Sequence, residues 1–243
     1  MSVHPILAIV PARGNSKGLP GKNVRPLGGL PLIVHSLRLA ARCPEIARCV
    51  VSTDDVHIAD VTRAHGGDVP FVRPPELALD DTPMMPVLQH ALREVERAEG
   101  RSYGSVLLLD PTSPGRLPED VTQAVTLLEG DPGAQGVIAC SKPTFNPFWV
   151  GVVVRGSYLA PAVAGPEYQR RQDVPTFLRV NGALYLWRRD FVERGGSWRD
   201  EPQLALEIPE ARALSIDDLH EFQVAEALLA AGLIELPWLA DRH

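Results

Sequence analysis

The chain has 243 residues, enough for one α/β domain with or without a small appendage. Its 45% hydrophobic and 22% charged residues are ordinary for a globular protein. The net charge of −6 argues against a nucleic-acid-binding protein. No apolar run approaches the roughly 20 residues that span a bilayer, and the N-terminal run is too short for a signal peptide. We therefore expect no nucleic-acid partner, no membrane segment and a cytoplasmic location.

Short apolar runs alternate with amphipathic segments through the first 140 residues. The run at residues 6–10 is apolar throughout, as in a strand buried on both faces of a parallel sheet. Further strands are expected at residues 49–52, 69–72, 105–110 and 136–140, and helices at 32–42, 57–64, 86–99 and 119–128. This alternation predicts an α/β fold with three layers and a doubly wound, mostly parallel sheet.

The alternation ends after residue 140. Residues 146–154 are expected to be extended, and the polar connection at 164–178 is long for a loop without a function. A strand and a short helix are expected within residues 181–192, and a strand and a final amphipathic helix within 210–232. Since no linker separates these segments, residues 1–243 are predicted to form a single domain.

Three cysteines, Cys43, Cys49 and Cys140, are spread along the chain. Their spacing matches no metal-binding or redox motif. We expect all three to be buried, small apolar residues.

A glycine-rich, cationic segment at residues 9–29 follows the first expected strand. It carries Arg13, Lys17, Lys22 and Arg25, and a helix after it would add the positive end of its dipole. A loop after a strand of an open α/β sheet lies at the carboxyl edge, where ligands bind. The combination predicts a polyphosphate site.

Two familiar phosphate-binding loops do not fit this segment. A Walker A loop would need glycine in place of Ser16 and a hydroxyl in place of Asn23. A dinucleotide fingerprint fails at Asn15 and Ser16, and the segment is too long and cationic for its tight turn. Several cations suit a free triphosphate, so Arg13 and Lys22 are predicted to stabilise the departing pyrophosphate. The alternative is a flexible, solvated basic loop.

The same segment resembles the signature PARxxSKxxPxKNxxxxxGxPLI of the CMP-sialic acid synthetase (acylneuraminate cytidylyltransferase) family. The segment "LLLDPTSPGR" is similar to that family's L-L-Q-P-T-S-P-L-R, and "SIDDLHEFQVAEALL" to its closing segment. The similar segments, in order, are residues 9–33, 50–55, 72–84, 107–116, 170–191 and 215–229. Six segments in order across nearly the whole chain make the resemblance specific.

The resemblance implies a fold of the nucleotide-diphospho-sugar transferase type and a Mg²⁺-dependent reaction. The anomeric hydroxyl of a 2-keto sugar acid, sialic acid or a related nonulosonate, would attack the α-phosphate of CTP and release pyrophosphate. Such chemistry depends on positioning and charge neutralisation more than on covalent steps by the protein.

The resemblance also implies roles for single residues. The catalytic set would be Arg13 and Lys22, which hold the β- and γ-phosphates, together with the metal ligand Asp217. Two structural alternatives remain open, since Arg73 could cap a helix and Asp217 could be the N-cap of the last helix. The nucleotide-binding residues would be Ala12, Arg13, Gly14, Lys22, Asn23, Ser52, Asp54 and Arg73; the substrate-binding residues Asp110, Thr112, Ser113, Arg116, Gln172, Asn181 and Tyr185; and the metal ligands Asp217 and Asp110.

Four positions depart from the family pattern. Asp110 replaces a glutamine that contacts the sugar acid, and a carboxylate there would repel an acidic substrate unless it is protonated, paired or metal-bound. Gly115 replaces leucine and is expected to leave extra room. Ser215 stands where a first aspartate of Asp-x-Asp is common, and Glu221 stands for a later aspartate. The hypothesis is that Asp110 compensates for Ser215 as a metal ligand.

Residues 143–180 are expected to form an inserted dimerisation arm. In the family, the part that corresponds to 160–178 crosses into a partner subunit, so Arg171, Gln172 and Arg179 could reach a neighbouring active site. The apolar "FWVGVVV" independently suggests a partner surface. The alternative is a solvated arginine-rich loop.

Two other functions remain open. One is a nucleotidyltransferase for a different acid sugar, of the 3-deoxy-octulosonate or legionaminate type. The other is a non-catalytic nucleotide-binding relative, which Asp110 and Ser215 favour.

Overall fold

The continuous apolar run near the N-terminus forms β1 (Ile6–Pro11), in which all six residues are buried. The computed structural model describes residues 3–240. In this part, β1 belongs to a six-stranded sheet with the order β10-β6-β9-β5-β1-β4. The other strands of that sheet are β4 (Ile46–Ser52), β5 (Ser105–Leu108), β6 (Gly136–Ser141), β9 (Arg179–Arg188) and β10 (Gln203–Glu207).

Most strand pairs of this sheet are parallel. β1 runs parallel to β4 and β5, and β10 runs parallel to β6. β9 runs antiparallel to both of its neighbours, β5 and β6. The expected mostly parallel α/β sheet is therefore confirmed, and the carboxyl ends of β1, β4 and β5 meet at one edge.

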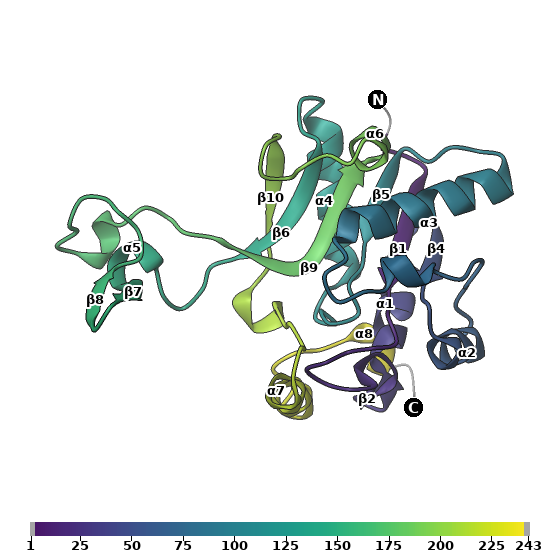
Figure 1. The fold of residues 1–243 in the computed structure, drawn as a ribbon, viewed down its shortest axis with the longest axis horizontal. Coiled ribbons are helices and arrows are strands. Elements are labelled where there is room, and N and C mark those ends of the chain that lie inside the picture. Colours follow the sequence, from purple (N-terminus) through teal and green to yellow (C-terminus); the bar gives the residue numbers. More distant parts are fainter. Residues whose placement is uncertain (1–2, 241–243) are drawn as a thin grey trace.

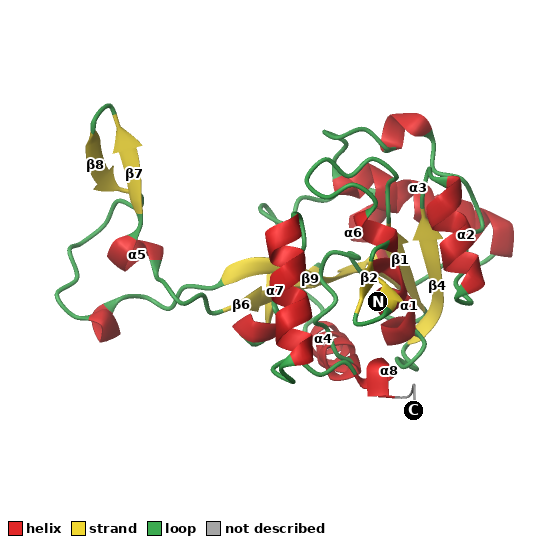
Figure 2. Cartoon of the chain, turned by 90° about the horizontal axis from the view of Figure 1, so that it is seen from below, coloured by secondary structure: helices red, strands yellow, loops and turns green. Residues whose placement is uncertain are grey.

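Helices lie on both faces of the sheet, which gives three layers (Figures 1 and 2). Leu7 and Ile9 of β1 point to one face and Ala8 and Val10 to the other, with the two-residue period of a strand. Burying each such Leu or Ile contributes about 1.5–3 kcal/mol to stability. The α-helices of the described residues are α1 (Leu32–Ala40), α2 (Val56–Ala64), α3 (Met84–Glu99), α4 (Pro118–Gly130), α5 (Pro147–Val150), α6 (Arg189–Glu193), α7 (Leu219–Ala230) and α8 (Pro237–Ala240).

The two faces have different helical cover. α3 and α6 pack on the face of Leu7 and Ile9, whereas α1 and α4 pack on the opposite face. None of the helices in residues 3–240 has both the length and the apolarity needed to cross a membrane.

The opening cationic loop does not lead into a helix. It ends in the 3-10 turn η1 (Lys22–Val24) and continues into a hairpin of β2 (Pro26–Leu27) and β3 (Leu30–Pro31) before α1 begins. The expected helix dipole is therefore absent at this loop, and its positive charge comes from side chains.

Two expected strands were wrong. Residues 69–72 form no ladder with β4. Only one backbone hydrogen bond on each side of them joins the chain to this region, from Val51 N to Asp68 O and from Arg73 N to Thr53 O. The strand expected before the final helix within 210–232 is replaced by the 3-10 turn η4 (Glu210–Arg212) and an irregular segment. β10 was not expected and supplies the edge strand instead.

The cysteines largely follow the expectation. Cys43 and Cys140 are buried, whereas Cys49 is only partly buried, and all three are free. Burial raises the pKa of Cys43 and that of Cys49 to about 12, so neither carries a reactive thiolate near neutral pH.

The arm (residues 143–180) extends away from the body between β6 and β9 (Figures 1 and 2). It contains α5, the hairpin of β7 (Val152–Arg155) and β8 (Tyr158–Pro161), and the 3-10 turn η3 (Arg171–Asp173). The segment 146–154 is thus half helical rather than extended throughout. The arm's exposed large apolar side chains are Phe145, Phe148, Trp149, Val150, Val152, Val153, Val154, Tyr158, Leu159 and, at the start of β9, Val180.

Candidate functional site

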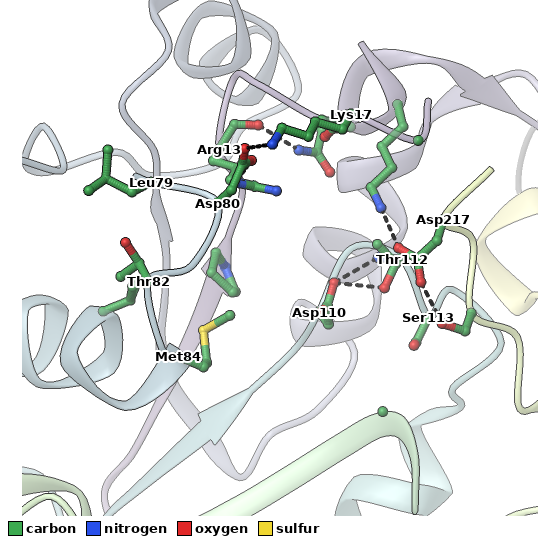
Figure 3. Close-up of a pocket in the computed structure, with 18 of the residues that line it drawn as sticks. Arg13, Lys17, Leu79, Asp80, Thr82, Met84, Asp110, Thr112, Ser113 and Asp217 are labelled. Carbon is green, nitrogen blue, oxygen red and sulfur yellow. Dashed lines mark hydrogen bonds and ion pairs between the residues drawn. The ribbon is translucent and has the colours of Figure 1, made fainter. Parts of the chain in front are cut away.

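A pocket of about 470 Å³ opens at the carboxyl edge of the sheet (Figure 3). Five segments contribute to it: the loop after β1, residues 73–87 at and before the start of α3, the turn after β5, Gly182 of β9, and the segment before α7. Its charged lining consists of four cations and three carboxylates: Arg13, Lys17, Lys22, Arg73, Asp80, Asp110 and Asp217. The structure therefore brings together the loop cations and both expected metal ligands.

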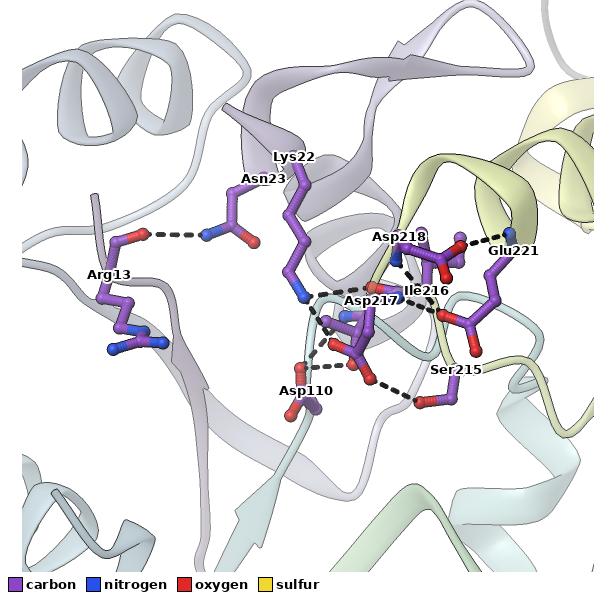
Figure 4. A network of polar contacts seen from close by, with 10 residues as sticks. Arg13, Lys22, Asn23, Asp110, Ser215, Ile216, Asp217, Asp218 and Glu221 are labelled. Carbon is purple, nitrogen blue, oxygen red and sulfur yellow. Dashed lines mark hydrogen bonds and ion pairs between the residues drawn. The ribbon is translucent and has the colours of Figure 1, made fainter. Parts of the chain in front are cut away.

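Lys22 binds the segment before α7 (Figure 4). Its Nζ lies 2.7 Å from Asp217 Oδ1 and donates a second hydrogen bond, of 3.0 Å, to the carbonyl of Ile216. The Lys22 side chain is only 13% exposed, so its position is well defined. This contact joins residues 195 positions apart in the sequence.

Arg13 and Lys17 bind a third carboxylate, Asp80, which was not among the expected site residues. Arg13 Nη1 lies 2.5 Å from Asp80 Oδ1, and Lys17 pairs with the other oxygen. Arg25, the fourth loop cation, does not line the pocket but lies over the ring of Phe222, 5.0 Å from its centre.

The backbone of the opening loop is held by hydrogen bonds within the protein. Asn23 is buried, and its side-chain amide donates to the carbonyl of Arg13 at 3.1 Å. The N–H of Gly14 donates to Asp54 Oδ1, and the N–H of Ala12 donates to the carbonyl of Ser52. The N–H groups of Ala12 and Gly14 thus bond within the protein, and Asn23, Asp54 and Ser52 hold the backbone of the loop in place.

Arg73 is buried beneath the pocket and binds the end of β4. Its Nε donates to Ser52 Oγ at 3.1 Å, and a terminal nitrogen donates to the Ser52 carbonyl. Burial lowers the pKa of Arg73 to about 10. Arg73 is therefore not a helix cap, and Ser52, fully buried, acts as its partner.

The turn after β5 is organised by Asp110. Asp110 Oδ1 accepts hydrogen bonds from the N–H and the hydroxyl of Thr112, at 3.0 and 2.9 Å. The Thr112 carbonyl accepts a bond from Ile216 N, which joins this turn to the segment that carries Asp217. Ser215 donates from its hydroxyl to Asp217 Oδ2 at 3.2 Å, so Ser215 supports Asp217 (Figure 4).

Asp217 is not the N-cap of α7. Asp218 is the N-cap, and it forms a capping box with Glu221, which also accepts a bond from the N–H of Asp217. The D-x-x-E spacing of residues 218–221 is a known sequence signal for this arrangement. Asp217 thus remains in the pocket, and Glu221 orients the backbone next to it.

A second cavity of about 320 Å³ lies on the far side of Asp110. Tyr185, Trp187 and Trp198 line it, together with Met84 and Met85 of α3. Burial, and then the charge of Asp110, raises the pKa of Tyr185 to about 12, so its phenol is a neutral donor. The cavity shares Asp110, Gly182 and Met84 with the larger pocket, which makes it a continuation of that pocket.

Two buried polar atoms close to this junction have no partner within the described residues. They are the hydroxyl of Ser113 and the side-chain nitrogen of Asn181. Gly182, the residue after Asn181, lies next to Ser113 Oγ with a left-handed φ of +74°. A buried polar atom without a partner costs free energy, and a bound molecule can supply the missing bond.

Arg116 and Gln172 are not brought to the pocket. Arg116 is buried in the core, where it donates to the carbonyl of Ala183 and to Ser36 Oγ, and burial lowers its pKa to about 10. Gln172 is exposed on the arm. Arg179, at the start of β9, pairs with Glu210.

Gly115 does not leave extra room, and that expectation was wrong. A Cβ at this position would lie 2.2 Å from the carbonyl oxygen of Arg212. Arg212 comes this close because it also forms an ion pair with the buried Asp120 at 2.6 Å. The space of the missing side chain is therefore filled by backbone.

Comparison with known proteins defines the family. The cytidylyltransferase family model matches residues 7–129. The CMP-N,N'-diacetyllegionaminic acid synthase of Legionella pneumophila is 31% identical, over 92% of this chain and 96% of the relative. An N-acylneuraminate cytidylyltransferase of Escherichia coli is 27% identical over 90% of this chain and 51% of that longer protein. The chain therefore belongs to the cytidylyltransferases, in the family of the CMP-sialic acid synthetases.

The fold agrees with this assignment. The structure of a CMP:2-keto-3-deoxy-manno-octonic acid synthetase complexed with CTP superimposes with a TM-score of 0.72, at 21% identity over 93% of this chain and 99% of the other. At this identity the likeness concerns the fold alone.

Proposed function

We propose that this protein transfers the cytidylyl group of CTP to the anomeric hydroxyl of a 2-keto sugar acid of the nonulosonate class. The observation that carries the proposal is a single pocket that holds the cationic loop and, from two other segments, Asp110 and Asp217. The family and the 31% identical relative support the same reaction. We also propose that the protein acts in the cytoplasm, where CTP is available as its substrate.

In the proposed reaction, the acceptor oxygen bonds to the α-phosphorus, and the bond from that phosphorus to the bridging oxygen breaks. Pyrophosphate leaves with the electron pair, and the hydroxyl proton passes to solvent. Arg13 and Lys22 hold the β- and γ-phosphates and stabilise the charge that grows on the leaving group. Arg73, fixed by Ser52, contributes positive charge from beneath the pocket.

We also propose that the reaction requires Mg²⁺. Residues 3–240 contain no group of three or more His, Cys, Asp and Glu side chains that could hold a metal ion alone. Mg²⁺ usually takes only one or two carboxylates from the protein and completes its coordination with phosphate oxygens and water. Asp110 and Asp217, which line one pocket, fit this requirement. Bound there with CTP, the ion would neutralise phosphate charge.

The cavity behind Asp110 is the proposed acceptor site. Its Met and aromatic lining suits the apolar part of an acylamino substituent, and the phenol of Tyr185 offers a hydrogen bond. The unpartnered atoms of Ser113 and Asn181 suit the hydroxyl or carboxylate groups of a sugar acid. A nonulosonate with acylamino groups is therefore preferred over a shorter sugar acid without them.

The active unit is proposed to be a homodimer formed through the arm. Ten large apolar side chains of the arm are exposed in the single chain, and burying them in a second copy would be favourable. Gln172 and Arg171, far from the pocket of their own chain, would then be available to the partner's pocket.

The test is product analysis. The protein is incubated with CTP, Mg²⁺ and a panel of 2-keto sugar acids with and without acylamino groups, and pyrophosphate release and product mass are measured. We expect a CMP-sugar with at least one nonulosonate. Turnover with another nucleotide but none with CTP would contradict the nucleotide assignment. CTP binding without pyrophosphate release for any acid would instead support a non-catalytic relative.

A further inference from the structure

Asp80 occupies the position of a counter-ion at the mouth of the large pocket (Figure 3). One oxygen of its carboxylate accepts a bond from Arg13, and the other pairs with Lys17. Both cations come from the opening loop, 67 residues away from Asp80 in the case of Arg13. Two of the three loop cations that line the pocket are therefore neutralised by a single carboxylate.

The chain presents Asp80 on a short segment that is fixed at both ends. Before it, the N–H of Arg73 bonds to the carbonyl of Thr53, and the 3-10 turn η2 (Pro75–Leu77) follows. A bond from the N–H of Thr82 to the carbonyl of Leu79 closes the turn that holds Asp80, and α3 begins at Met84. Since the segment is fixed on both sides, its backbone holds Asp80 in a position that faces the opening cationic loop.

The ion pairs of Asp80 are exposed and exchangeable. The side chains of Asp80, Arg13 and Lys17 are 40%, 30% and 79% exposed, respectively. Exposed ion pairs contribute little stability because solvent screens them. Hydrogen bonds from Lys17 and Arg13 lower the pKa of Asp80, so the carboxylate is ionised at neutral pH. A polyphosphate carries more negative charge than one carboxylate and would be the stronger partner of the two cations.

We propose that Asp80 is an internal competitor of the polyphosphate: it holds Arg13 and Lys17 while the pocket is empty and releases them when the phosphates enter. This inference rests on the proposed function, because it requires a polyphosphate ligand. Asp80 is thus a positioning residue that keeps both cations at the pocket. Because Asp80 competes with pyrophosphate for Arg13 and Lys17, it also limits the affinity for this product and favours its release.

The experiment compares the full-length protein with Asp80→Asn and with the matched control Asp81→Asn. Asp81 is the neighbouring exposed carboxylate and does not line the pocket. Binding of pyrophosphate and of CTP, each with Mg²⁺ and without acceptor, is measured by titration calorimetry. We expect Asp80→Asn to bind pyrophosphate at least about threefold more tightly than Asp81→Asn, the scale of exposed ion pairs. When Lys17→Met is added to both variants, the difference in pyrophosphate affinity between Asp80→Asn and Asp81→Asn should become smaller, because one of the two cations that Asp80 holds is gone.

The outcomes separate the inference from the proposed function. If the wild type binds CTP and Asp80→Asn binds pyrophosphate no more tightly than Asp81→Asn, the inference is overturned and the function stands. Weaker binding by Asp80→Asn also overturns it, since Asp80 would then serve the ligand. If no protein binds CTP or pyrophosphate, the proposed function fails, and the inference with it. Melting curves check folding, and Asp80→Ser replaces Asp80→Asn if the latter does not fold.

Discussion

Single residues differ in how firmly they hold their place in the pocket. The Lys22 side chain is 13% exposed and has two fixed partners, whereas Lys17 is 79% exposed and has an exchangeable one. Asp217, the ionic partner of Lys22, is itself 68% exposed, so its carboxylate is accessible to a ligand in the pocket. Lys22 and Asp217 are therefore the most direct test of the proposed chemistry.

The first prediction concerns Lys22→Ala. It removes a cation from the developing pyrophosphate, so we expect kcat/KM to fall about 100-fold or more. The melting temperature should change by only a few degrees, since one ion pair with an exposed carboxylate and one hydrogen bond to the Ile216 carbonyl are lost. Lys142→Ala, an exposed lysine outside the pocket, is the control and should retain activity. If Lys22→Ala lost folding and activity to the same extent, the role of Lys22 would be to stabilise the fold and not to stabilise pyrophosphate.

The second prediction concerns Asp110→Asn. Asparagine can still accept the bonds from Thr112, so the turn after β5 should persist. The loss of one carboxylate should raise the Mg²⁺ concentration for half-maximal activity by about tenfold. Magnesium titration of the two proteins measures this. An unchanged metal requirement would remove the hypothesis that Asp110 compensates for Ser215.

At the scale of elements, the loops at the carboxyl edge depend on close backbone contacts. The turn that follows β5 touches η4 at Gly115, with the Arg212–Asp120 ion pair on the same contact. The position of η4 in turn fixes the path of the chain to Ser215 and Asp217. A glycine that seemed to enlarge the substrate site is thus required for packing.

The third prediction follows from this contact. In Gly115→Ala, the new methyl group would collide with the Arg212 carbonyl, so the free energy of unfolding should fall by about 1–3 kcal/mol. Gly130→Ala, at the end of α4, is the matched control, because nothing lies within 4 Å of its added Cβ. It should be neutral or stabilising. Urea unfolding compares the two, and equal stabilities would contradict the packing role.

At the scale of the whole molecule, the arm is the feature that a single chain leaves unexplained. It extends from the body on two connecting segments (Figure 2). The side chains of Val154, Tyr158 and Leu159 on it are exposed. A two-stranded hairpin with little core of its own is marginally stable in water. A second copy of the chain would bury these side chains and stabilise the hairpin.

The fourth prediction tests this arrangement. We expect the wild type to sediment as a dimer and Val154→Glu to weaken the dimer about tenfold or more, because it buries a charge in an apolar contact. Val56→Glu is a close control, since Val56 is 75% exposed and Val154 is 73% exposed. It should remain dimeric. A monomeric wild type in sedimentation velocity would count against the homodimer.

The order of most strands and helices could be predicted because local patterns determine them. The apolar run of β1, the Asp55 N-cap of α2 and the helical spacing of Leu88, Ala91 and Leu92 act over a few residues. β10 was missed because its strand character depends on pairing with β6 rather than on its own pattern. The strand expected at residues 69–72 was wrong for the converse reason, since this apolar run found no ladder partner.

The sequence by itself determined the fold class, the family and the identity of the cationic loop, because these depend on local periodicity and on motifs in order. Only the tertiary structure decided which charges meet: Arg13 and Lys17 with Asp80, Lys22 with Asp217, and Arg116 with the core. Such contacts join residues 63 positions apart (Lys17 and Asp80) to 195 positions apart (Lys22 and Asp217). The packing of the sheet and its loops brings them together, and no local pattern carries that information.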